Sequence, residues 1–156
     1  MTARPSRELI HMANAFMWAS RSLCSRLHVG AVITTCDLKR VLSIGYNGPA
    51  KGLPEDRCKA SIPGGCGCLH AEDNAIAQCD STIPSKVLFV THQPCETCAQ
   101  RIIQAGFARV YYSKTYRSDS GATLLQSMGI GVYLLDDPLI DQVVELMEAV
   151  RTRKAK

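Results

Sequence analysis

The sequence lacks the features that mark membrane, exported, repetitive or disordered chains. No apolar run approaches the roughly 20 residues that a membrane-spanning helix needs. The nearest stretch, residues 10–19, contains His11 and Asn14 and has no small-residue cleavage site, so it predicts a helix and not a signal peptide. No repeat or low-complexity segment is present, and 46% apolar with 21% charged residues is typical of a globular chain. A length of 156 residues predicts one domain, residues 1–156.

A strong charge of one sign is also missing from the body of the chain. The net charge is +4, but four basic residues lie in the last six positions, in a basic tail at residues 151–156. Without this tail the chain is neutral, which argues against a surface for polyanions. We therefore expect neither a nucleic acid nor a membrane as partner.

Cysteine, in contrast, is abundant, with eight residues. Without an export signal we expect a cytoplasmic location, where thiols stay reduced, so metal binding or catalysis is favoured over disulfides. Cys36 and Cys79 have no close cysteine neighbour, and we expect them to pack in the core as small hydrophobic residues.

Hydrophobic periodicity predicts alternating helices and strands. Two β-rich runs, residues 29–34 and 41–46, flank a polar turn and predict an antiparallel hairpin. The later strands are joined through helices, which is the connection that parallel pairing requires. The sequence thus predicts an α/β fold with helices on both faces of one sheet. The other expected strands are residues 87–91, 110–113 and 132–135, and the expected helices are residues 5–22, 71–79, 96–104, 122–128 and 139–151.

Two short motifs carry the candidate chemistry, His-Ala-Glu at residues 70–72 and Pro-Cys-Glu-Thr-Cys at residues 94–98. Each opens a predicted helix, and the strand between the helices can bring both helix starts to one end of the sheet. A Cys-x-x-Cys pair alone would also suit a redox motif or half of a structural zinc site. With His70, however, Cys95 and Cys98 give three metal ligands and leave a fourth position for water, which is typical of catalytic zinc. Glu72 can reach that water as a general acid and base.

This H-x-E and P-C-x-x-C pattern is the signature of zinc-dependent nucleobase deaminases. The chain resembles the cytidine deaminase superfamily and, within it, the deoxycytidylate (dCMP) deaminases of bacteria and phages. The zinc motifs specify only the superfamily, while residues 45–48 (GYNG) and 102–106 (IIQAG) point to the dCMP branch. Asp73 stands where Leu or Met is more usual, which predicts altered packing beside Glu72. The matching stretches are residues 24–33, 45–49, 69–76, 90–95 and 98–106.

The resemblance implies a fold, a reaction and an assembly. The fold is a three-layer sandwich around a five-stranded mixed sheet of order 2-1-3-4-5, with strands 4 and 5 parallel. The reaction is zinc-dependent hydrolysis of dCMP to dUMP and ammonia, which supplies dUMP for thymidylate synthesis. The family often forms homo-oligomers, typically hexamers, and is often regulated by dCTP and dTTP near residues 45–49.

The resemblance also implies substrate contacts. Asn47 is expected to contact the sugar and Tyr116 to lie against the base, although an Asn before a Gly also suits a turn. Arg26 is the leading candidate for the phosphate because it precedes a strand in a matched motif. Lys51 is a second candidate for this contact, and Arg21 and Arg117 compete with both. Ala71, between His70 and Glu72, is a further candidate.

A second, structural zinc is also expected. Cys58, Cys66 and Cys68 crowd the long Gly/Pro-rich loop at residues 47–68, and Cys24 belongs to an early matched motif. The loop has little apolar content, so a metal would provide the order that it lacks. Some phage-type relatives carry a structural zinc in this region. Cys68 lies close to His70, so whether Cys66 or Cys68 joins Cys24 and Cys58 stays open.

Three other functions share these features. A transfer-RNA adenosine deaminase has the same zinc motif but should present a basic face to phosphates. A deaminase of another cytosine substrate, such as a nucleoside, an analogue or a 5-modified dCMP, would use the same chemistry. A non-catalytic zinc module would not need the carboxylate of Glu72.

Overall fold

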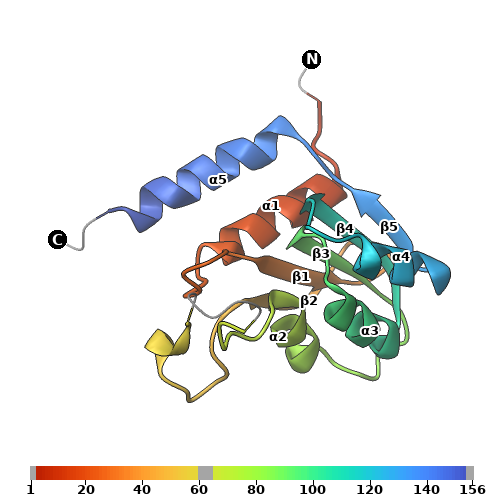
Figure 1. The fold of residues 1–156 in the computed structure, drawn as a ribbon. Coiled ribbons are helices and arrows are strands. Elements are labelled where there is room, and N and C mark those ends of the chain that lie inside the picture. Colours follow the sequence, from red (N-terminus) through yellow and green to blue (C-terminus); the bar gives the residue numbers. More distant parts are fainter. Residues whose placement is uncertain (1–2, 60–64, 154–156) are drawn as a thin grey trace.

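A five-stranded mixed sheet lies between two layers of helices in the computed structural model, which describes residues 3–59 and 65–153 (Figure 1). Gly64 of the long loop and Lys154 and Lys156 of the tail lie outside the described residues. The strands are β1 (Gly30–Thr34), β2 (Val41–Tyr46), β3 (Lys86–His92), β4 (Phe107–Lys114) and β5 (Gly131–Leu134). The helices are α1 (Arg7–Ala19), α2 (Ala71–Gln78), α3 (Glu96–Ala105), α4 (Ser120–Ser127) and α5 (Pro138–Arg151), with a 3-10 turn η1 (Glu55–Arg57).

The strand order β2-β1-β3-β4-β5 confirms the expected topology. Strand β1 pairs antiparallel with both β2 and β3, while β3–β4 and β4–β5 are parallel. The antiparallel pair β1–β2 is the predicted hairpin, and its turn contains Leu38 in the left-handed region, with φ 60°. The turn η1 within the long loop was not predicted, since one helical turn is too short to show a period.

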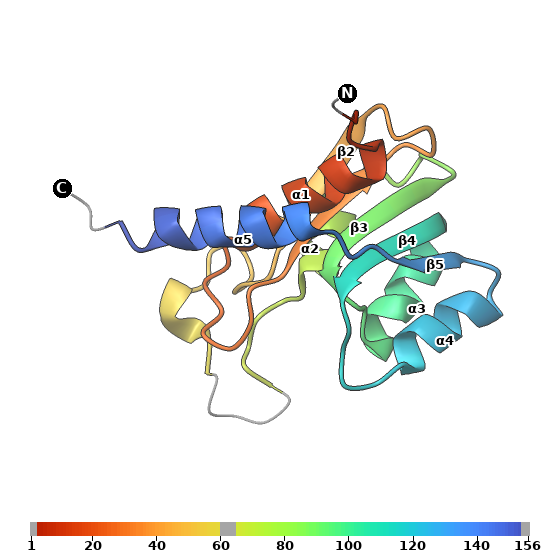
Figure 2. The same ribbon diagram turned by 90° about the horizontal axis from the view of Figure 1, so that it is seen from above.

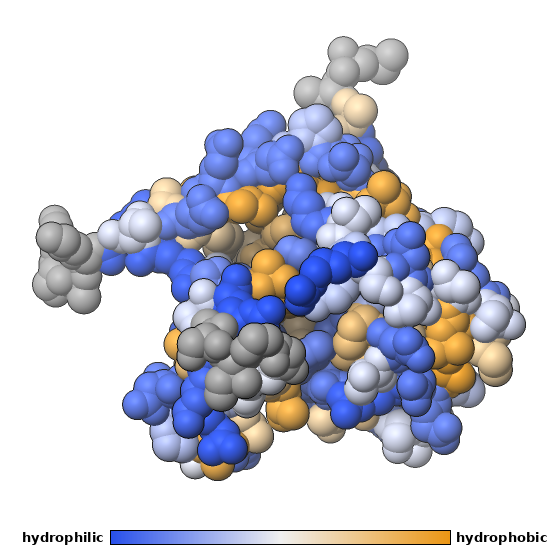
Figure 3. Space-filling model, viewed as in Figure 1, coloured by the Kyte–Doolittle hydropathy of each residue, from blue (hydrophilic) through white to orange (hydrophobic). Residues whose placement is uncertain are grey.

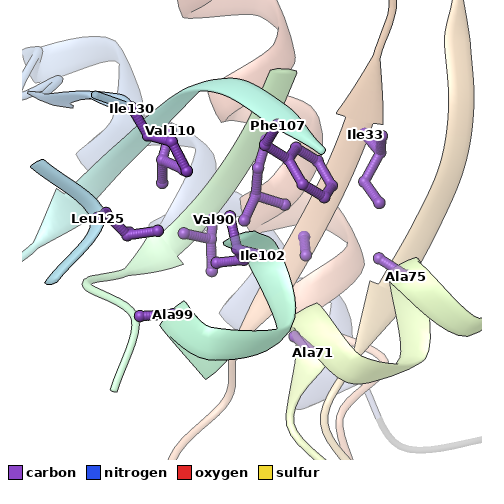
Figure 4. Packing of buried hydrophobic residues seen from close by; sticks show 12 residues of the cluster. Ile33, Ala71, Ala75, Val90, Ala99, Ile102, Phe107, Val110, Leu125 and Ile130 are labelled. Carbon is purple, nitrogen blue, oxygen red and sulfur yellow. The ribbon is translucent and has the colours of Figure 1, made fainter. Parts of the chain in front are cut away.

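Side chains of the central strands point alternately to the two faces of the sheet and belong to two separate hydrophobic clusters. Leu88 and Val90 of β3 face a cluster with α2, α3 and α4, whereas Val87 and Phe89 face α1 and α5. Figure 2 shows α1 and α5 together on one side of the sheet and α3 and α4 on the other. Figure 4 shows the first cluster closing around Val90, with side chains from α3, β4 and α4 pointing toward it. Burying each such aliphatic side chain contributes about 1.5–3 kcal/mol.

Local signals set where the helices begin and end. The Ser6 hydroxyl accepts a hydrogen bond from the Leu9 N–H and begins α1, and Asp137 does the same for the Leu139 N–H at α5. Gly106, with φ 77°, ends α3 in the left-handed conformation that glycine adopts without strain. Helices α2 and α3 both begin near the carboxyl end of β3, which positions the site described next.

Two cysteine predictions differ in outcome. Cys79 is partly buried beside the first cluster, as expected of a small hydrophobic residue. Cys36 is exposed, so its assignment to the core was wrong: it lies in the hairpin turn, where its thiol donates to the Ser85 hydroxyl at 3.3 Å. Within residues 3–59 and 65–153, no helix combines the length and apolar character that crossing a membrane requires.

Candidate active site

The starts of α2 and α3 bring three metal-ligand side chains together. His70 is the N-cap residue of α2, and Cys95 is the N-cap residue of α3, with Cys98 in the first turn. The His70 Nδ1 atom lies 3.3 Å from Cys98 Sγ and 3.6 Å from Cys95 Sγ. These three residues, here called the histidine–cysteine site, are thus the trio that the motif spacing predicts.

The geometry of the histidine–cysteine site fits a zinc ion. Tetrahedral coordination at usual bond lengths places a sulfur and a nitrogen ligand about 3.6 Å apart. All three ligand atoms lie within 4.8 Å of one another, and a single ion can reach them together. Because His70 makes no capping hydrogen bond to its helix, its Nδ1 is free to turn toward the sulfurs.

Contacts among these three side chains shift their pKa values. Hydrogen bonds with Cys98 and then with His70 lower the pKa of Cys95 to about 3. The hydrogen bond with Cys95 raises the pKa of His70 to about 9, while the same neighbour and burial raise the pKa of Cys98. One thiolate is therefore present near neutral pH at a helix N-terminus, where negative charge is favoured.

Glu72 lies in the first turn of α2 and is only 4% exposed. Burial raises the pKa of its carboxyl group to about 7, because desolvation disfavours the charged form. A carboxyl group with this pKa can both accept and release a proton near neutral pH. The neighbouring Asp73 pairs instead with Arg101 of α3, so the residue that departs from the family pattern links the two helices of the site.

A pocket with a volume of about 330 Å³ opens beside the histidine–cysteine site. Its wall includes His70, Cys95 and Glu72, so two residues of the histidine–cysteine site and the buried carboxyl group border one cavity. The four residues predicted to bind substrate also line it. They are Arg26, Asn47, Ala71 and Tyr116.

The competing basic residues separate into two groups. Arg26 and Arg117 line the pocket, and neither forms an ion pair with a described residue. Lys51 lines a different cavity, beside residues 44–55, and Arg21 lines neither of these cavities. The Arg117 guanidinium lies 5.7 Å from the centre of the Tyr116 ring.

The side chain of Asn47 lines the pocket and also forms hydrogen bonds with the backbone of the segment before β1. Its Oδ1 accepts from the Val29 N–H at 2.8 Å, and its Nδ2 donates to the Leu27 carbonyl at 2.7 Å. Asn47 therefore fixes the chain that leads into β1. An amide Nδ2 carries two hydrogens, so one remains for a ligand.

The long loop and the segment between α1 and β1 together form a second cysteine site, here called the four-cysteine cluster. Its members are Cys24, Cys58, Cys66 and Cys68. Cys24 Sγ lies 3.6 Å from Cys58 Sγ and 4.0 Å from Cys66 Sγ. A disulfide would need about 2.05 Å, whereas tetrahedral zinc holds sulfurs about 3.8 Å apart. All eight cysteines of the chain are free thiols. The sulfurs of Cys66 and Cys68 both belong to this group of four, so the geometry offers both of them as candidate ligands.

The protonation of the four-cysteine cluster is uneven. Hydrogen bonds from the backbone and side chain of Ser25 lower the pKa of Cys58 to about 6. Burial raises the pKa of Cys24 and of Cys68. Three of the four cysteines also line the pocket, so this cluster borders the same cavity as the histidine–cysteine site.

Two polar residues of the pocket, His92 and Gln93, were not predicted from the sequence. Both lie directly before the Pro94-Cys95 motif, at the end of a buried strand. Polar residues in that position were the one available signal, since no spacing rule marks them. The ion pair between Asp73 and Arg101 was also not predicted, because no spacing rule marks a contact between these two helices.

A His-Cys-Cys donor set beside a buried glutamate, at the end of such a mixed sheet, is typical of zinc-dependent nucleobase deaminases. The chain matches the family model described as the cytidine and deoxycytidylate deaminase zinc-binding region over residues 4–114, and it belongs to this family.

Individual relatives agree with this membership. The chain is 33% identical over 127 residues to the deoxycytidylate deaminase of Mycobacterium phage D29, covering 72% of this chain and 98% of that protein. It is 36% identical over 142 residues to the deoxycytidylate deaminase of Saccharomyces cerevisiae, covering 83% of this chain but only 45% of the longer yeast protein. The structure is similar to that of the cyanophage S-TIM5 dCMP deaminase in complex with dCMP and dUMP. The TM-score is 0.74 at 32% identity, over 86% of this chain and 100% of that one.

Proposed function

We propose that this chain is a dCMP deaminase, which converts dCMP and water to dUMP and ammonia. The observation that carries the proposal is the histidine–cysteine site on a pocket that also holds a buried carboxyl group and two arginines without an ion pair among the described residues. The relatives named above support the nucleotide substrate, because their names or titles refer to deoxycytidylate, dCMP or dUMP.

His70, Cys95 and Cys98 would hold the catalytic zinc, which supplies a Lewis acid for activating water. Glu72 serves as the proton carrier. It accepts a proton from the attacking water and delivers it to N3 of the cytosine ring as the water oxygen bonds to C4. It then carries the remaining proton of the C4 hydroxyl to the amino group, which leaves as ammonia when the C4–N bond breaks and the C4 carbonyl forms. Its burial keeps the pKa of the carboxyl group close to neutral pH, so neither direction of transfer is strongly uphill.

The remaining pocket residues divide the recognition of the nucleotide. The ring of Tyr116 would lie against the base, and the second Nδ2 hydrogen of Asn47 would donate to a sugar hydroxyl. The small side chain of Ala71 leaves room for the base beside Glu72. Arg26 binds the 5′-phosphate, with Arg117 as the second cation on the wall.

A second, structural zinc is part of the proposal, with Cys24, Cys58, Cys66 and Cys68 as its ligands. Four sulfurs at these separations match a closed tetrahedral site, which contributes stability and not chemistry. The reduced thiols suit a cytoplasmic location.

Assembly into a homo-oligomer, with a hexamer as the family expectation, is also proposed. Apolar residues are exposed on α1 and α5, among them Met17, Leu146 and Val150. Figure 3 shows hydrophobic residues in the hollow between the projecting α5 and the body of the molecule. For dCTP or dTTP as effectors, the support is a cavity of about 430 Å³ that includes Gly45 and Pro49.

Ammonia release from dCMP, deoxycytidine, dCTP, cytidine and adenosine, measured side by side, tests the proposal. We expect dCMP to give the highest kcat/KM, by at least about 10-fold over deoxycytidine, because one sheltered phosphate contact is worth about 1.5–3 kcal/mol. Equal kcat/KM values for dCMP and deoxycytidine would show that the proposed nucleotide specificity is wrong and would indicate a nucleoside deaminase. Activity on adenosine and on none of the cytosine substrates would instead indicate an adenosine deaminase.

A further inference from the structure

Gln93 is a buried polar residue for which the reaction above provides no role. It is 4% exposed and follows β3 directly, two residues before Cys95. Its Oε1 accepts from the Tyr116 N–H at 3.1 Å, and its Nε2 donates to Asp119 Oδ1 at 3.2 Å. Both partners belong to the segment at residues 115–119, which joins β4 to α4 and is here called the Tyr116 loop.

Both ends of the Tyr116 loop are fixed to the same few residues before α3. At its start, the Gln93 N–H donates to the Lys114 carbonyl at 2.8 Å. At its end, Gly121 of α4 packs so closely on the backbone of Pro94 and Cys95 that a Cβ atom there would lie 2.1 Å from the Pro94 oxygen. Between these two fixed ends, the side chain of Gln93 forms hydrogen bonds with Tyr116 and Asp119 of the loop.

The Tyr116 loop itself contributes little burial that would hold it in place. Tyr116 is 37% exposed, and Arg117, Ser118 and Asp119 are exposed as well. A buried amide is costly unless it is hydrogen-bonded, and both polar groups of Gln93 are bonded to this loop. Yet the side chains that the loop carries, Tyr116 and Arg117, line the pocket.

We propose that Gln93 is a positioning residue that sets substrate affinity by fixing Tyr116 and Arg117 on the pocket wall. Gln93 acts through these two residues and need not touch the reacting atoms. The part of the proposal that concerns affinity rests on the proposed deaminase function, whereas the fixing of the loop does not.

An exchange of hydrogen-bonding groups tests this assignment. In Gln93→Glu, two carboxyl groups face each other where an amide N–H met a carboxylate, so the loop should shift. In the double variant that adds Asp119→Asn, the introduced amide can donate to the introduced carboxylate, which still accepts from the Tyr116 N–H. Asp119→Asn alone keeps an acceptor for Gln93 and is the matched control.

We expect Gln93→Glu to raise KM for dCMP by about 10-fold and to leave kcat within about 3-fold of the wild-type value. This pattern is expected when a variant loses binding energy that contributes equally to the ground state and to the transition state. The double variant should recover most of this loss, and Asp119→Asn should remain near wild type. Gln93→Met, which keeps the volume and removes both bonds, should reproduce the rise, and it should fold because water can reach Tyr116 and Asp119. An unchanged KM in Gln93→Met, or no recovery in the double variant, would overturn the proposal.

Trypsin cleavage after Arg117 gives a readout that does not depend on catalysis. Cleavage should be at least about 5-fold faster in Gln93→Met than in wild type, because proteolysis follows the population of opened loop. Cleavage after Arg57, in a separate exposed segment, should be unchanged and serves as the control. If the wild type did not deaminate dCMP, the proposed function would fail while faster cleavage still supported the positioning role. Equal cleavage after Arg117 in both proteins would contradict it.

Discussion

The two cysteine sites of this molecule border one pocket, yet the chain builds them in different ways. The histidine–cysteine site lies on the N-termini of α2 and α3, beside β3, whose backbone hydrogen bonds and buried side chains fix the positions of all three ligands. The four-cysteine cluster draws its ligands from segments with no helix or strand at any of the four cysteines.

We therefore propose that the fold positions the histidine–cysteine site, whereas a bound metal would order the four-cysteine cluster. A site on regular elements keeps its geometry when one ligand is removed, because the elements are stabilised elsewhere. A site on loops depends on the ligand for its order, so metal binding and loop folding are coupled. Substitutions in the two sites should therefore differ in their effect on dCMP turnover.

The largest effect is expected for Cys95→Ala. Loss of one of three ligands should remove the catalytic zinc and reduce deamination to background, while the secondary structure stays intact because α3 is held by its apolar face. Zinc per chain by elemental analysis, circular dichroism and ammonia release check this. Cys79→Ala, at a cysteine outside both sites, is the matched control. A Cys95→Ala protein with undiminished zinc and activity would show that the ion is held elsewhere.

The next effect is expected for Glu72→Gln, which keeps shape and removes the ionisable group. A general acid–base group typically contributes about 10²–10⁴-fold to the rate of a reaction. Because Glu72 serves several proton transfers, we expect kcat to fall by at least about 10²-fold. Zinc content should remain that of the wild type. Near-normal turnover would exclude Glu72 as the proton carrier, and loss of zinc would make it a ligand instead.

The same contrast explains how far the sequence predicts this protein. His70 and Cys95 were found because their motifs open helices that flank one buried strand, and that topology follows from periodicity. For the four-cysteine cluster, Cys24 and Cys58 were predicted with Cys66 or Cys68 as the alternative third ligand, because the loop carries no period from which the place of each sulfur follows. The contact of Gln93 with Tyr116 depends on how one loop folds back on another, and no local pattern records such a contact.

Arg26→Ala tests the pocket wall beside the four-cysteine cluster. We expect kcat/KM for dCMP to fall by about 10-fold or more, with a much smaller change for deoxycytidine, because a charge-assisted phosphate contact is worth about 1.5–3 kcal/mol. Lys51→Ala, at a cation outside this pocket, should leave both substrates unaffected. Equal losses on dCMP and deoxycytidine after Arg26→Ala would indicate a structural role for this arginine.

The smallest effect on turnover is expected for Cys58→Ser, which breaks the four-cysteine cluster. Zinc should fall by about one ion per chain, since three remaining sulfurs hold a structural ion less tightly. The catalytic step should persist, with kcat within about 3-fold, because the histidine–cysteine site does not depend on the loop for its geometry. KM should rise by a few-fold at most, through Cys24, Cys66 and Cys68 on the pocket wall.

The loop itself should respond more strongly than the reaction in this variant. Trypsin should cleave after Arg57, beside the altered ligand, faster in Cys58→Ser than in wild type, while cleavage after Arg117 stays the same. Treating the wild type with a chelator mild enough to spare activity should reproduce the faster cleavage, because it removes the same ion. If Cys58→Ser instead lost all activity with the catalytic zinc still bound, the two sites would be coupled through the pocket, and the distinction between a site placed by the fold and a site placed by its metal would not hold for this chain.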